Sequence, residues 1–169
     1  VTSSGYDFYT RASNAVWTSS AGNLTFGGPD TDTNGFAMFK DSQKLEDGVI
    51  TTKILQTHPQ FVDNGSISGR YPAYTVVQGE HFTARIGFLA LADGSCGAGN
   101  VKFQLNYREG GGAITPLAEW TKFEGSTTVV LNHTLVLSGA RFKPGISVML
   151  QAVAYDRRDA FPVARRAEV

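Results

Sequence analysis

An alternation of apolar and polar side chains over residues 101–108 constrains the fold of this chain more than any other feature. The apolar positions are Val101, Phe103, Leu105 and Tyr107, and the polar ones are Lys102, Gln104, Asn106 and Arg108. A period of two places the two sets on opposite faces of a β-strand, so that one face is buried and the other faces water. Residues 82–90 repeat the pattern, with Phe82, Ala84, Ile86 and Phe88 on one face. We therefore expect two long strands, joined by a glycine-rich turn, in an antiparallel sheet that packs on one side.

The rest of the chain is typical of short strands separated by turns. Apolar, aromatic and β-branched residues gather in segments 14–17, 23–26, 35–40, 49–57, 66–69, 74–77, 117–120, 127–131, 134–137 and 145–155. Gly, Pro, Asn and Asp lie between them, and Asp63-Asn64-Gly65 is a strong hairpin signal. No window has a helical period. The sequence thus predicts an all-β fold, an antiparallel β-sandwich or jelly roll of about ten to twelve short strands.

Length and charge set the class of protein. A chain of 169 residues without a linker or an internal repeat predicts a single β-sandwich domain over residues 1–169, in which residues 1–11 form an N-terminal arm or an edge strand. Fifteen basic and fifteen acidic side chains cancel. Nucleic acids and anionic membranes attract a basic excess, so neither is expected as a partner. No apolar run approaches the about 18 residues of a membrane span, and the single cysteine, Cys96, cannot form an internal disulfide.

A calcium loop is the sharpest local motif. Asp30, Asp32 and Asn34 alternate before Gly35, and Asp41 stands at the twelfth position. Calcium takes six to eight oxygen ligands, and alternate side chains of a tight turn converge on one point. The motif predicts a structural calcium ion held by Asp30, Asp32, Asn34 and Asp41. The alternative is a plain solvated turn, because Asp, Asn and Gly are also ordinary turn residues.

Exposed aromatic rings would give the chain a second kind of site. Rings stack on the apolar faces of sugars, and the candidate ligand-binding residues are Arg70, Tyr71, Tyr74 and Trp120. The alternative is that these rings belong to the core, as large aromatic side chains in sandwiches often do.

Catalytic and zinc-binding motifs are absent from the sequence. The three histidines lack metal-ligand spacing, no G-x-S-x-G elbow occurs, and no carboxylate pair can be placed across a cleft. We therefore expect a protein that is not an enzyme. Asn23, Asn64 and Asn132 each begin an N-glycosylation sequon and are predicted glycosylation sites.

Two stretches, residues 55–61 and 69–76, resemble a module of large secreted or surface proteins of bacteria. Residues 44–48 and 82–106 extend this resemblance, which covers about residues 14–155. In strand order the chain is also similar to the galactose-binding-like jelly rolls that serve as carbohydrate-binding modules. Residues 159–163 lack the tryptophan expected in the last strand of a sugar-binding relative. The resemblance implies an extracellular or cell-surface module without catalytic activity that holds a structural calcium ion.

Two functions follow from these observations. The first is a structural or adhesive subunit that assembles with copies of itself, or with other surface proteins, into a surface layer or an extracellular filament. A sandwich can extend by pairing a strand with the open edge of a neighbour. The second is a calcium-assisted carbohydrate-binding module that recognises a polysaccharide.

Overall fold

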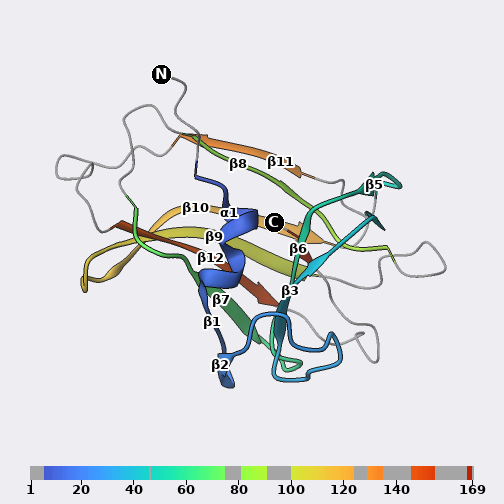
Figure 1. The fold of residues 1–169 in the computed structure, drawn as a ribbon, viewed down its shortest axis with the longest axis horizontal. Coiled ribbons are helices and arrows are strands. Elements are labelled where there is room, and N and C mark those ends of the chain that lie inside the picture. Colours follow the sequence, from blue (N-terminus) through green and yellow to red (C-terminus); the bar gives the residue numbers. More distant parts are fainter. Residues whose placement is uncertain are drawn as a thin grey trace.

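The computed structural model describes residues 6–45, 47–74, 81–90, 100–123, 129–134, 146–154 and 167–168 (Figure 1). These residues form thirteen strands, of which three are only two residues long, together with one short α-helix and one 3-10 helix. Every pair of neighbouring strands among them is antiparallel. The prediction of an all-β fold is confirmed.

The largest sheet has six strands and runs across the middle of Figure 1. In spatial order its strands are β10 (Ile114–Phe123), β9 (Asn100–Glu109), β12 (Ile146–Ala154), β7 (Ser66–Arg70), β1 (Val16–Ser19) and β2 (Gly22–Leu24). Neighbouring strands run in opposite directions throughout. Because β10 and β2 stand first and last in this order, they are the two edges of the sheet among the described strands.

Three smaller sheets accompany it. They are the pair β11 (Val129–Thr134) with β8 (His81–Ile86), the three strands β13 (Ala167–Glu168), β6 (Ile54–His58) and β3 (Phe36–Lys40), and the pair β4 (Gln43–Lys44) with β5 (Ile50–Thr51). The β8–β11 pair lies at the top of Figure 1, above β9, β10 and β12. The segment 49–57, expected as one strand, is divided because Lys53 takes a positive φ of 57° between β5 and β6.

The two long alternating segments belong to different sheets. β8 pairs with β11, whereas β9 lies between β10 and β12. Their predicted inner faces are nevertheless correct, because Phe82 and Ile86 of β8 are buried in the same cluster as Phe103 and Leu105 of β9. The prediction that the two segments pair within a single sheet is wrong. The two strands lie in different sheets and contribute side chains to one core. The 91–99 connection lies outside the described residues.

Trp17 lies at the centre of the core and needs a glycine opposite it. It is paired in register with Gly69 of β7, and a Cβ built on Gly69 would meet the Trp17 ring at 2.5 Å. The indole Nε1 donates a hydrogen bond of 2.8 Å to the carbonyl oxygen of buried Ala12. The absence of a side chain at Gly69 thus lets the indole lie flat against β7.

The start of the chain is an arm with one turn of helix. Helix α1 (Phe8–Arg11) and the 3-10 helix η1 (Ala12–Asn14) precede β1. The Asp7 carboxylate accepts hydrogen bonds from the backbone N–H groups of Tyr9 and Thr10, which an N-terminal cap must satisfy. Of the two expectations for residues 1–11, the edge strand is wrong for Phe8–Arg11. A helix of one turn is too short to leave a periodic signal, and residues 1–5 lie outside the described part.

Candidate functional site

The predicted calcium loop is a hydrogen-bonded turn between β2 and β3. Asp32 Oδ1 accepts a hydrogen bond of 2.9 Å from the backbone N–H of Asn34, and the Asp32 carbonyl oxygen accepts one of 3.1 Å from Gly35. Gly35 has a φ of 103°, and a Cβ there would meet the His58 carbonyl oxygen at 2.8 Å. Asp32 and Gly35 therefore determine the path of the loop.

The other predicted calcium ligands are turned to different partners. Asp30 Oδ2 forms an ion pair of 2.9 Å with Lys40 Nζ, and Asp41 lies next to Ser42, whose hydroxyl donates to its carboxylate at 3.4 Å. Within the described residues, no three His, Cys, Asp or Glu side chains gather closely enough to hold a metal ion. In this arrangement Lys40 pairs with one oxygen of the Asp30 carboxylate, which a calcium ion would have to share or displace. Calcium binding here stays a prediction.

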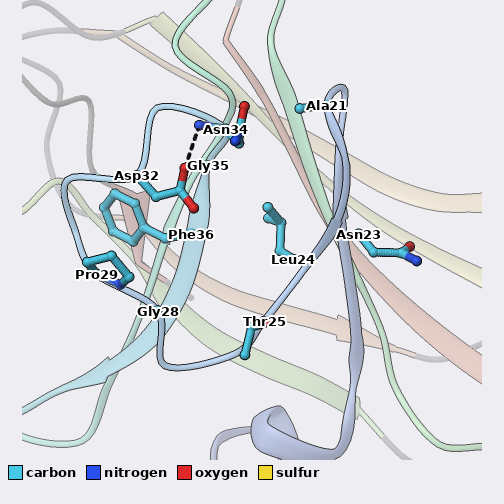
Figure 2. Close-up of a pocket in the computed structure, with 10 residues that line it drawn as sticks. All are labelled: Ala21, Asn23, Leu24, Thr25, Gly28, Pro29, Asp32, Asn34, Gly35 and Phe36. Carbon is cyan, nitrogen blue, oxygen red and sulfur yellow. Dashed lines mark hydrogen bonds between the residues drawn. The ribbon is translucent and has the colours of Figure 1, made fainter.

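A cavity of about 310 Å³ opens beside this loop (Figure 2). It lies between β2, the loop and the first residues of β3, and its lining mixes amide and carboxylate groups with apolar ones: Ala21, Asn23, Leu24, Thr25, Gly28, Pro29, Asp32, Asn34, Gly35 and Phe36. Figure 2 shows Leu24 directed into the space and Asn23 directed away from it. The Asp32 carboxylate offers a hydrogen-bond acceptor beside the apolar Leu24 and Phe36, which suits a small ligand with hydroxyl groups.

The predicted sugar-stacking residues do not form one surface. Tyr71 is only 1% exposed, so its ring belongs to the core and the prediction of a ligand contact is wrong for this residue. Burial raises the pKa of its hydroxyl well above the ordinary value. Trp120 of β10 is half-buried and packs on the same core, and Arg70 is exposed at the end of β7. Of the two interpretations that the sequence left open for Tyr71, a sugar-stacking ring or a core ring, the structure supports the core ring.

The N-terminal arm covers Tyr71 and Tyr74. Tyr6 stacks on Tyr74 with ring centroids 4.1 Å apart, and its hydroxyl donates to the Pro72 carbonyl oxygen at 3.1 Å. Phe8 meets the edge of Tyr71 at 4.9 Å. The Arg11 guanidinium lies 4.6 Å from the centre of the Tyr6 ring. The aromatic run of this arm is visible in the sequence, but its packing against Tyr71 and Tyr74 is not. Contacts between rings about 65 residues apart in the chain leave no local pattern.

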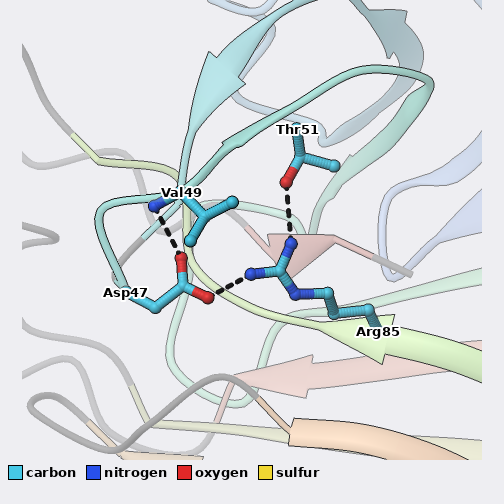
Figure 3. Close-up of polar contacts among 4 residues, drawn as sticks. All are labelled: Asp47, Val49, Thr51 and Arg85. Atoms are coloured by element: carbon cyan, nitrogen blue, oxygen red, sulfur yellow. Dashed lines mark hydrogen bonds and ion pairs between the residues drawn. The ribbon is translucent and has the colours of Figure 1, made fainter.

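A second polar cluster ties the β4–β5 hairpin to β8 (Figure 3). Arg85 of β8 forms an ion pair with Asp47 and donates a hydrogen bond of 2.9 Å to the Thr51 hydroxyl. The other oxygen of Asp47 accepts from the backbone N–H of Val49 at 2.9 Å. One arginine thus holds both the turn and the second strand of the hairpin.

The outer face of β10 and β9 carries a small charged group. Glu119 of β10 accepts hydrogen bonds from Lys102 Nζ at 2.8 Å and from Gln104 Nε2 at 2.7 Å, both on β9. These donors lower the pKa of the Glu119 carboxyl. The negative charge of Glu119 therefore has its counter-charge on the neighbouring strand of the same chain.

β10 is the long open edge of the six-stranded sheet. Among the described strands only β9 pairs with it. Pro116 and a bulge between Pro116 and Ala118 interrupt its first half, whereas pairing with β9 is regular from Ala118 to Phe123. Proline and bulges hinder the pairing of an edge strand with a further strand. The second half of β10 is therefore the part that can pair with a strand of another molecule.

Two of the three predicted glycosylation sites are accessible. Asn23 on β2 and Asn64 in the turn before β7 are exposed, and Asn64 has the positive φ of 55° that turn asparagines adopt. Asn132 lies opposite Thr83 in the β11–β8 pair, and its side chain is outside the described part. Use of these sequons stays a prediction.

Comparison of this chain with protein-family models, with curated proteins and with solved structures gives no match. In the part of the chain that the structure describes, no helix is long and apolar enough to cross a membrane.

Proposed function

We propose that this chain is a non-catalytic extracellular module that assembles with copies of itself, as a structural or adhesive subunit of a surface layer or filament. The observation that supports the proposal is the open edge of β10. This strand is ten residues long, about twice the usual length of a strand. An edge strand presents a row of unpaired backbone N–H and C=O groups, which pair readily with a strand of another chain.

The charge of the chain favours the same function. Its fifteen basic and fifteen acidic side chains leave no net charge, so copies do not repel one another at neutral pH. Glu119, the acidic residue in the regular half of β10, is matched by Lys102 within its own chain. A second copy therefore meets no unpaired carboxylate on this half of the edge, where Lys122 is the other charged residue.

Light scattering coupled to size exclusion, over a concentration series, tests the proposal. We expect a mass that rises with concentration and ordered assemblies in negative-stain images. Each condition is repeated with a calcium chelator, because loss of assembly on chelation would connect the predicted ion to this function. A folded monomer at every concentration, with and without calcium, would overturn the proposal.

A lysine on the edge tests whether β10 is the strand that assembles. Thr121 is exposed in the regular half of β10, and lysine at such a position discourages pairing between edges. We expect Thr121→Lys to shift the chain towards monomer. Thr52→Lys is the matched control, because Thr52 is exposed between β5 and β6, away from this edge.

Carbohydrate binding assisted by calcium is the second candidate, and the cavity beside Asp32 favours it. Its carboxylate and amide groups next to Leu24 and Phe36 suit the hydroxyl groups and apolar face of a sugar. Electrophoresis through polysaccharide gels, with calcium and with chelator, measures this binding. Asp32→Asn keeps the acceptor for the Asn34 N–H but removes the charge, and Thr33→Ala on the exposed side of the loop is the control. Equal mobility in gels with and without polysaccharide would reject this function.

A further inference from the structure

We propose that assembly begins with a two-fold dimer in which β10 of one copy pairs antiparallel with β10 of the second, with Trp120 opposite Trp120 of that copy. This inference rests on the proposed self-assembly and adds the strand, the symmetry and the register. The two six-stranded sheets then continue into one another across the axis.

The lengths of the edges select β10. At the other edge of the same sheet, β2 has three residues, and β13 at the edge of the three-stranded sheet has two. The strands of the two-stranded sheet, β8 and β11, have six residues each, against the ten of β10. The outer side of β3 is already used, because the Ala37 carbonyl oxygen accepts a hydrogen bond of 2.8 Å from the Gly27 N–H. Pairing β10 with β2 of another copy would satisfy few backbone groups, whereas β10 against itself offers the longest match. A like-with-like contact closes into a dimer about a two-fold axis.

Symmetry restricts the register to a few choices. Residues directly opposite in an antiparallel pair lie on the same face of the sheet. A two-fold axis normal to the sheet keeps the faces of the two copies aligned, so a residue must stand opposite itself at the axis. The regular half of β10 covers residues 118–123, and a centre at Lys122 or Phe123 would pair three residues or fewer. The centre is therefore Ala118, Glu119, Trp120 or Thr121.

The side chains of β10 exclude two of these centres. With Glu119 at the axis, two carboxylates would face each other, and directly opposed like charges are destabilising. With Ala118 at the axis, Trp120 would stand opposite Pro116, which has no N–H to donate and lies beside the bulge. Trp120 and Thr121 remain.

Of these two centres, Trp120 gives the more favourable side-chain pairs. In the regular half both centres pair five residues, 118–122 for Trp120 and 119–123 for Thr121, because β10 ends at Phe123 and the bulge lies between Pro116 and Ala118. A centre at Thr121 would set Trp120 opposite Lys122 and Glu119 opposite Phe123, whereas a centre at Trp120 sets two aromatic residues opposite each other. Trp120 stands opposite Phe103 of the core cluster and packs on that cluster, so it is on the inner face. Two such rings at the axis extend the core across the interface. On the outer face, Glu119 then stands opposite Thr121 of the second copy.

Disulfide trapping reads this register directly. The parent is Cys96→Ser, because Cys96 is the single cysteine of the chain. Glu119→Cys and Thr121→Cys are made separately in this background and oxidised alone and as an equal mixture. Directly opposite residues have Cα atoms about 4.5–5.5 Å apart, within the range that a disulfide spans. We expect about tenfold more linked dimer in the mixture than in either variant alone, because only the Trp120-centred register sets 119 opposite 121.

Each other outcome overturns the register. Efficient linkage of Thr121→Cys with itself indicates a centre at Thr121, and linkage of Glu119→Cys with itself indicates a centre at Glu119. Thr115→Cys mixed with Thr121→Cys is the control on the same strand. Thr115 pairs with Tyr107 and Thr121 with Lys102, which lie on opposite faces of β9, so no linkage is expected there and linkage would contradict this pairing. Light scattering on the Cys96→Ser parent separates the two levels of inference. A monomeric parent rejects self-assembly itself, whereas an assembled parent without 119–121 linkage rejects only this register.

Discussion

Trp17 of β1 lies directly against Gly69 of β7, and no side chain fits between them. A Cβ on Gly69 would come within 2.5–2.9 Å of three ring carbons of Trp17. The indole cannot move aside cheaply, because it is 2% exposed and its Nε1 is bonded to the Ala12 carbonyl oxygen. The two residues hold the centre of the core and the N-terminal helical turns in one arrangement.

Gly69→Ala is therefore expected to lower the free energy of unfolding by about 1–3 kcal/mol, the usual cost of overpacking a core. Urea denaturation measures it. Gly111→Ala is the matched control, because nothing lies within 4 Å of a Cβ at Gly111. An unchanged midpoint for Gly69→Ala would show that the indole has room to shift.

Tyr71→Phe is expected to stabilise the protein. Among the described residues, no group forms a hydrogen bond with the buried Tyr71 hydroxyl, and an unmet buried hydroxyl costs about 1–3 kcal/mol. We expect the free energy of unfolding to rise by about 1 kcal/mol when the oxygen is removed. Tyr6→Phe is the counterpart, because the Tyr6 hydroxyl donates to the Pro72 carbonyl oxygen, and its loss lowers stability by about 0.5–1.5 kcal/mol. Thermal melts of both variants test the contrast, and a destabilised Tyr71→Phe would contradict it.

Alkaline pH should unfold the protein partly through Tyr71. Its pKa in the folded chain is raised from the ordinary value of 10.0 by burial, so above pH 10 the unfolded state loses this proton while the folded state keeps it. Stability is then complete below pH 10 and falls as pH rises, by up to about 1.4 kcal/mol per pH unit from this one group. Denaturation curves from pH 9 to pH 11.5 measure the slope. Tyr71→Phe should flatten it, and equal slopes in the two proteins would refute the assignment.

Arg85→Ala should release the β4–β5 hairpin without unfolding the rest. Its guanidinium joins Asp47 and Thr51 to β8, but it is about one third exposed. Solvent screening limits the loss of global stability to about 0.5–1 kcal/mol. The sharper readout is hydrogen exchange, which we expect to accelerate at the backbone N–H groups of Leu45 and Val49. Lys53→Ala, on an exposed side chain next to the hairpin, is the control. Unchanged exchange in Arg85→Ala would show that backbone pairing alone holds the hairpin.

Local patterns predicted the elements and their faces. The alternation over residues 101–108 correctly placed Val101, Phe103 and Leu105 inside, and the spacing of Asp32 and Gly35 correctly indicated a turn. These features depend on a period of two and on single-residue conformational preferences, both of which act within a few residues.

Contacts between distant segments were beyond such patterns. Asn106 was expected in water and is only 4% exposed, and Gln56 is fully buried in a strand whose five residues are all covered. The sequence left open whether Tyr71 lies on the surface or in the core, and in the structure Tyr6 and Phe8 of the N-terminal arm cover it. A strand's period shows which residues share a face, but it does not show what packs against that face.

By itself, then, the sequence determined that this chain is built of antiparallel strands with defined inner faces and tight polar turns. Only the tertiary structure decided that β8 and β9 enter different sheets, that Asp30 pairs with Lys40, and that β10 is a long edge among the strands the structure describes. The physical reason is that strand pairing and burial are set by contacts between residues far apart in the chain. Many pairings share the same local pattern, and the native one is selected by the packing of the whole core.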